Sequence, residues 1–129
     1  MKKILTFKKR KDFLRVAKQY YIATHNVVVQ AAHSLCSDEN IYVGYTATKK
    51  IGNAVVRCKA KRRLRAIVRE ILFENATQNV DYIFIARNST AFCDYNELKK
   101  DTIFAIKKLN KNFTNTNQPT PNEHNEKNI

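Results

Sequence analysis

Several residue types are scarce in this 129-residue chain, and each scarcity excludes a class of site. With two glycines in total, the chain has no glycine-rich loop of the kind that cradles phosphate groups. The three cysteines, Cys36, Cys58 and Cys93, lie far apart and form no Cys-x-x-Cys pair. Together with the three histidines they give no zinc-site spacing. We therefore expect the protein to bind no cofactor and no metal ion of its own.

Long apolar runs and catalytic motifs are also missing. No apolar run approaches the roughly 20 residues that span a bilayer. The apolar stretch after Met1 is interrupted by a basic run at 8–11, so no signal peptide is predicted. The acidic residues show no paired spacing for metal-dependent hydrolysis, and no Ser-His-Asp or Cys-His motif is present. We expect a cytoplasmic protein without a membrane partner and without catalytic residues, and the unpaired cysteines fit a reducing compartment.

Acidic side chains are scarce relative to basic ones. The chain carries 24 Lys and Arg against 11 Asp and Glu, a net charge of +13. Such an excess destabilises a compact domain by self-repulsion unless a polyanion relieves it, so nucleic acid is the favoured partner. The length and the 43% hydrophobic content predict one folded domain over 1–113. The polar segment 114–129, which holds both prolines, is predicted to be a disordered tail.

One segment is both strongly basic and strongly patterned. Residues 49–69 hold nine Lys or Arg and no acid. Its apolar residues recur at helical spacing, which predicts a helix from about 53 to 75: Val56, Ala60, Leu64, Ile67 and Ile71. The basic residues on the far side recur every four positions, and Arg62 extends them: Arg57, Lys61, Arg65 and Arg69. Solvated helix faces usually mix both signs of charge, so this all-positive face predicts RNA binding.

The remaining elements follow from periodicity. We predict helices over about 8–19 and 95–113, and strands over 22–32, 41–48 and 80–87, the last being central because it is mostly apolar. Residues 49–52 form a tight link, and Asn53 is the expected N-cap of the basic helix. This order predicts an α+β fold, a two-layer sandwich with a small mixed sheet. We expect a groove between the sheet and the first helix.

The sequence in and around the basic helix resembles that of a known family. Lys-Lys-Ile-Gly-Asn-Ala-Val-Val-Arg at 49–57, followed by Lys61-Arg62 and Arg65, is similar to the signature of the protein component of bacterial ribonuclease P. The resemblance extends over about 5–109. Asp12-Phe13, Val43-Gly44 and the run 81–87 (Asp-Tyr-Ile-Phe-Ile-Ala-Arg) match other parts of the family pattern at its spacing.

The resemblance implies a ribonucleoprotein in which the RNA subunit performs the chemistry. That catalytic RNA uses magnesium and removes the 5′ leader of precursor tRNA, while the protein binds both RNAs. The implied fold has a left-handed βαβ crossover around the basic helix, against the general right-handed rule. The implied contacts to the catalytic RNA are Lys49, Lys50, Asn53, Arg57, Cys58, Lys59, Lys61, Arg62, Arg65 and Arg69. The implied leader-binding residues are Phe13, Ala17 and Tyr20.

Two departures from the family pattern leave alternatives open. Arg57-Cys58-Lys59 stands where the family usually has Arg-Asn-Arg, and a thiol cannot replace an amide's hydrogen bonds. Ala17 stands where the family tends to carry a second aromatic, so Tyr20 or Tyr21 is an alternative stacking surface. Phe13 is equally consistent with a core position. Cys58 lies among cations and is also consistent with a redox-sensitive thiol.

Two other functions fit the size and charge of the chain. A structural ribosomal protein binding ribosomal RNA is the main alternative. A DNA-binding regulator is the second, but the segment before the basic helix is predicted to be a strand. A helix-turn-helix needs a helix and a short turn at that place, so we expect no DNA partner.

Overall fold

The computed structural model describes residues 2–7, 9–36 and 38–114. In chain order the elements are β1 (Ile4–Thr6), α1 (Arg10–Ala17), β2 (Tyr20–Ala23), β3 (Val27–His33), β4 (Ile41–Thr46), the 3-10 helix η1 (Lys49–Ile51), α2 (Ala54–Asn75), β5 (Val80–Ala86) and α3 (Tyr95–Thr114). Of the predicted tail, Thr114 is the last residue of α3, and 115–129 lie outside the described residues.

The five strands form one mixed sheet in the order β1-β4-β5-β3-β2. Strands β1, β4 and β5 run parallel, whereas β3 is antiparallel to both β5 and β2. Helix α2 therefore connects two neighbouring parallel strands, β4 and β5. The predicted α+β class, the mixed sheet and the central position of β5 are confirmed.

One strand prediction was wrong, and one strand was not predicted. The predicted single strand over 22–32 is a hairpin of β2 and β3, in which Tyr20 pairs with Ala31 and Ala23 with Val28. Its turn is closed by Thr24, whose backbone N–H donates to the carbonyl of Val27 at 2.9 Å. Strand β1 was not predicted, because three residues are too short to show a period. It is added to the sheet beside β4, with Ile4 opposite Ile41.

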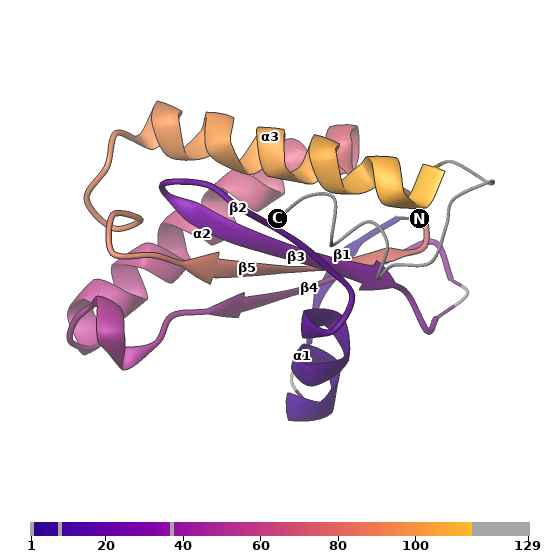
Figure 1. Cartoon of the computed structure of the whole chain (residues 1–129), viewed down its shortest axis with the longest axis horizontal. Helices are drawn as coiled ribbons and strands as arrows, with labels where there is room; N and C mark the ends of the chain where they lie inside the picture. Colours follow the sequence, from indigo (N-terminus) through magenta and orange to yellow (C-terminus); the bar gives the residue numbers. More distant parts are fainter. Residues whose placement is uncertain (1, 8, 37, 115–129) are drawn as a thin grey trace.

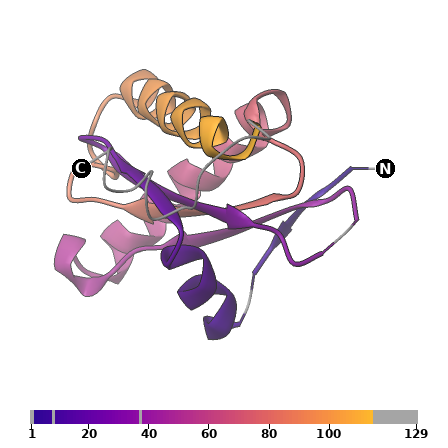
Figure 2. The same cartoon turned by 45° about the vertical axis from the view of Figure 1, so that its right-hand side comes forward.

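The helices lie on both faces of the sheet. Helices α2 and α3 cover one face and α1 lies against the other, as Figures 1 and 2 show from two sides. The main core fills the space between the sheet and the pair α2/α3, and its largest fully buried side chains include Tyr20, Leu64, Ile67, Leu72, Tyr82, Phe84, Leu98, Ile106 and Leu109. Alternation along β5 sends Tyr82 and Phe84 into this core and Ile83 toward α1.

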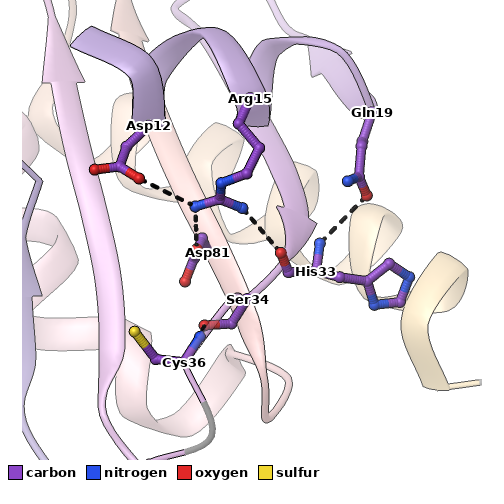
Figure 3. A network of polar contacts seen from close by, with 7 residues as sticks. All are labelled: Asp12, Arg15, Gln19, His33, Ser34, Cys36 and Asp81. Atoms are coloured by element: carbon purple, nitrogen blue, oxygen red, sulfur yellow. Dashed lines mark hydrogen bonds and ion pairs between the residues drawn. The ribbon is translucent and has the colours of Figure 1, made fainter. Parts of the chain in front are cut away.

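A partly buried ion pair fixes α1 on its face of the sheet (Figure 3). The guanidinium of Arg15 donates to Oδ2 of Asp81 on β5 at 2.7 Å and to the carbonyl of His33 at 2.9 Å. Burial raises the pKa of the Asp81 carboxyl, and the hydrogen bond from Arg15 opposes that rise. Gln19, just after α1, accepts from the backbone N–H of His33 at 3.3 Å. These contacts hold the short helix in one position relative to β3 and β5.

Candidate nucleic-acid interface

The basic helix α2 begins at a defined cap. Oδ1 of Asn53 accepts from the backbone N–H of Val56 at 3.0 Å, which confirms the predicted N-cap. Gly52 before it has a φ of +148°, and a Cβ there would lie 2.9 Å from the side chain of Val56. Glycine is therefore required at this junction. The exposed Lys49 and Lys50 of η1 thus stand directly beside the first turn of α2.

The predicted two sides of α2 are confirmed. Ala60, Leu64 and Ile67 are fully buried, and Ile71 is nearly so. The opposite side is exposed and includes Cys58, Lys59, Arg62, Arg65 and Arg69. Arg57 and Lys61 lie at the border and are half-buried. The structure therefore gathers the predicted RNA-binding side chains of α2 along one long surface, which we call the basic face.

Aromatic rings border the basic face on both flanks. The guanidinium carbon of Arg65 lies 5.5 Å from the ring centroid of Tyr45 on β4. On the other flank, Nζ of Lys59 lies 5.5 Å from the ring centroid of Phe92, in the segment 87–94 that joins β5 to α3. Contacts of this kind orient the long basic side chains without neutralising their charge.

Arg63 is absent from the predicted interface, and the structure shows why. Its guanidinium donates to the carbonyls of Thr90 and Cys93, both at 2.7 Å, and lies 5.7 Å from the ring of Tyr95. Arg63 precedes the fully buried Leu64 and lies at the edge of the apolar stripe of α2. That position was the sequence signal that Arg63 faces the protein and not the RNA. Its role is to tie the segment 87–94 to α2.

The predicted leader-binding residues are separated by the sheet. Phe13 is half-buried on the α1 face, in a small cluster with Val16, Ala32 and Ile83, and its ring meets Phe7 edge-on at 6.2 Å. It is therefore both a packing residue and partly accessible. Ala17 is exposed at the end of α1.

The prediction for Tyr20 is corrected by the structure. Its ring is 2% exposed, lies in the main core on the opposite face, and meets Phe113 of α3 at 5.1 Å. A buried ring cannot stack on an RNA base. Because side chains alternate along a strand, the adjacent Tyr21 faces the α1 side, where it is 47% exposed.

A cavity of about 340 Å³ does lie beside α1, but its lining differs from the expected one. It opens between α1, β1 and β4, and its walls include Phe7, Arg15, Tyr42 and Asp81, with Lys9 and Lys11 also among its lining residues. The rings of Phe7 and Tyr42 are stacked at 6.1 Å. None of Phe13, Ala17 and Tyr20 lines this cavity.

Within 2–7, 9–36 and 38–114, no helix is both long enough and apolar enough to cross a membrane. The same residues contain no group of three or more His, Cys, Asp or Glu side chains that could hold a metal ion. Cys58 carries a free, exposed thiol on the basic face.

Comparison with known families decides between the alternatives. The family model described as ribonuclease P matches residues 1–110. The chain belongs to this family. The resemblance in the signature 49–65 is therefore confirmed, and these comparisons lend no support to the alternative of a ribosomal protein.

Individual relatives agree with the ribonuclease P assignment. The ribonuclease P protein component of Caulobacter vibrioides is 41% identical over 99 residues, which cover 77% of this chain and 66% of that relative. The protein component of Paramagnetospirillum magneticum is 38% identical over 106 residues, covering 79% of this chain and 80% of that relative. The chain thus spans slightly less than two thirds of the Caulobacter relative.

Solved structures share the fold. The RNase P protein of Staphylococcus aureus superposes with a TM-score of 0.67 at 26% identity, covering 81% of this chain and 94% of that one. The RNase P protein from Thermotoga maritima gives a TM-score of 0.68 at 20% identity, covering 80% and 96%. The mixed five-stranded sheet with its three helices is therefore the fold of bacterial ribonuclease P proteins.

Proposed function

We propose that this chain is the protein subunit of a cytoplasmic ribonuclease P ribonucleoprotein. It binds the catalytic RNA through the basic face of α2 and assists removal of the 5′ leader from precursor tRNA. The observation that carries the proposal is the acid-free stretch 49–69, which η1 and α2 hold in place with every basic side chain except Arg63 on or beside the basic face. Cations that repeat along a fixed helix can each neutralise a phosphate of an RNA backbone, whose charges also repeat.

The chain's own residues contribute binding and positioning. The chemistry belongs to the RNA subunit, and we place the magnesium requirement there. Each phosphate that a Lys or Arg neutralises releases a condensed counterion and lowers the repulsion between RNA segments. The protein therefore reduces the magnesium concentration at which the catalytic RNA is active. Rigorously RNA-free protein is expected to show no cleavage of precursor tRNA.

The leader is assigned to the α1 face, on the other side of the sheet from α2. Phe13 and Ala17 lie on α1, and the exposed Tyr21 takes the place that Tyr20 cannot fill. Aromatic rings accept any unpaired base by stacking, which suits a single-stranded leader of variable sequence. Because α2 and α1 lie on opposite faces, both RNAs can be bound at once (Figure 2).

The test of the basic face is a charge-matched pair of variants. The first replaces Arg57, Lys61, Arg62 and Arg65 by alanine. The second replaces four exposed lysines of α3 by alanine: Lys100, Lys107, Lys108 and Lys111. Affinity for the RNA subunit is measured against salt concentration. The first variant should reduce the salt slope by up to about four, roughly one per phosphate contact, and the second by much less. Equal losses in the two variants would show that total charge acts, not the basic face.

The test of the leader surface compares substrates. In the reconstituted holoenzyme, Phe13→Ala and Tyr21→Ala should weaken binding of precursor tRNA, while binding of mature tRNA and of the RNA subunit stays unchanged. Ala17→Phe adds a second ring on α1 and should strengthen precursor binding. Circular dichroism checks that each variant is folded. A precursor preference that survives in the folded Phe13→Ala, Tyr21→Ala double variant would exclude stacking on this face.

A further inference from the structure

We infer that Phe92 is a stacking platform for an unpaired base of the catalytic RNA, placed at the flank of the basic face. This inference rests on the proposed function. Phe92 is 66% exposed, although its neighbour Ala91 is almost completely buried. Its ring lies 5.5 Å from Nζ of Lys59, a side chain of the basic face itself. The site thus pairs an exposed aromatic ring with a cation next to the predicted phosphate contacts.

The segment that carries Phe92 is anchored on both sides of the ring. Before it, the hydroxyl of Thr90 donates to the carbonyl of Asn26 at 2.5 Å and accepts from the backbone N–H of Arg87 at 2.7 Å. The backbone N–H groups of Phe92 and Cys93 both donate to the carbonyl of Ser89, at 3.0 and 2.8 Å. The backbone under the ring is therefore already ordered, and little conformational entropy is lost when a partner binds.

Arg63 holds the segment that carries Phe92 against α2. Its two hydrogen bonds reach the carbonyls of Thr90 and Cys93, which lie on either side of Phe92 in the sequence. Arg63 lies one turn of α2 beyond Lys59, so its hydrogen bonds hold the segment 87–94 against the part of the helix that carries Lys59. A strand of RNA whose phosphates contact the basic face has its bases within reach of this ring.

Stacking on an unpaired base is the chemistry that best fits this arrangement. A rigid, exposed ring next to a cation offers a flat apolar surface for a base and a positive charge for its phosphate. Removal of such a ring typically lowers affinity by about 5- to 150-fold. Because stacking involves no net charge, the loss should leave the salt slope of binding unchanged. The basic-face variants are expected to behave in the opposite way, with a reduced slope.

The experiment measures affinity of the RNA subunit for the full chain carrying Phe92→Ala, Phe92→Leu or Phe92→Trp. The alanine and leucine variants should each lose affinity at an unchanged salt slope, and tryptophan should retain it. Phe104→Ala on α3 is the matched control, because that ring is 54% exposed and also lies 5.5 Å from a lysine, Lys108. Chemical probing of the bound RNA should show one nucleotide protected by the native chain and by Phe92→Trp, but not by Phe92→Ala.

The outcomes separate this inference from the proposed function. If the native chain fails to bind the RNA subunit, the proposed function itself is wrong. If it binds and Phe92→Ala binds equally well, only the platform is excluded. Retained affinity in Phe92→Leu would show that apolar volume matters rather than an aromatic face. An equal loss of affinity in Phe104→Ala would show a nonspecific effect. Either result overturns the inference. Loss of self-association in Phe92→Ala, at unchanged RNA affinity, would reassign the ring to a protein contact.

Discussion

Replacing Gly44 by alanine should destabilise the protein through one identifiable contact, the ring of Phe13. A Cβ at position 44 would lie 2.7 Å from Cε1 and 2.8 Å from Cζ of that ring. Carbon atoms in favourable contact are about 3.5–4.0 Å apart, so the ring would have to move by about 1 Å. Phe13 is half-buried and can move toward solvent, at the expense of its contacts with Val16 and Ile83.

Two effects of known size oppose each other at Gly44. Overpacking of this kind costs about 1–3 kcal/mol. Glycine to alanine at a permitted backbone conformation gains about 0.4–1 kcal/mol, because the unfolded chain loses freedom. Gly44 has no positive φ, so that gain applies. The two ranges combine to a net loss of up to about 2.6 kcal/mol, which at a urea m-value of about 2 kcal/mol/M lowers the midpoint by up to about 1.3 M.

A double-mutant cycle measures the contact directly. In a Phe13→Ala background the clash is absent, so Gly44→Ala should become neutral or stabilising, and the coupling should be about 1–3 kcal/mol. Gly52→Ala is the control, because its strain comes from a φ of +148° and from Val56, both independent of Phe13. Its cost should be the same in both backgrounds. If Gly44→Ala also costs the same in both, the ring is not the reason for glycine at this position.

Three further predictions concern the helix α2 and the core. Arg63→Ala should cost about 1–3 kcal/mol in urea unfolding, because two partly buried carbonyls lose their donor. Arg62→Ala should change stability by less than about 0.5 kcal/mol and reduce the salt slope of RNA binding. The reverse pattern would exclude the assigned roles. Leu64→Ala should cost about 2–5 kcal/mol, since its side chain is fully buried, and a thermal melt that matches the native one would refute that burial. Burial raises the pKa of Tyr82 to about 12, above its value of about 10 in an unfolded chain, so stability should be intact below pH 10 and decline from pH 10 to 12. Tyr82→Phe should flatten part of that decline in unfolding measured against pH, and an unchanged slope would contradict it.

The basic helix was predictable because local signals agree there. Apolar residues at helical spacing, an Asn before the first turn and an acid-free opposite face all specify the same element. The hairpin of β2 and β3 was not predictable by the same means. Its turn, Thr24-His25-Asn26, contains no glycine or proline, and the flanking residues are uniformly apolar enough to be taken for one strand.

The assignment of the adjacent tyrosines shows another limit. Tyr20 and Tyr21 have the same chemistry, and only the pairing of Tyr20 with Ala31 decides which ring enters the core. Register between strands is a property of the assembled sheet, and a shift by one residue would exchange the two rings. The platform at Phe92 was missed for a related reason. Its neighbour Lys59 is 33 positions away in the sequence, and no local pattern connects them.

The place of β5 in the sheet has a consequence for how the chain folds during synthesis. Strands β1 and β4 form one pair and β2 and β3 another, and β5, the last strand to be made, joins the two pairs. Until residue 86 has left the ribosome, each pair exposes an unpaired inner edge, and α2 lacks β5, one of the two strands on which it packs. The cationic helix is thus complete before the sheet that it covers, while the chain is still beside the RNA of the ribosome. Its seven basic residues are available to nucleic acid at that stage, and insertion of β5 is the step that confines all of them except Arg63 to the basic face.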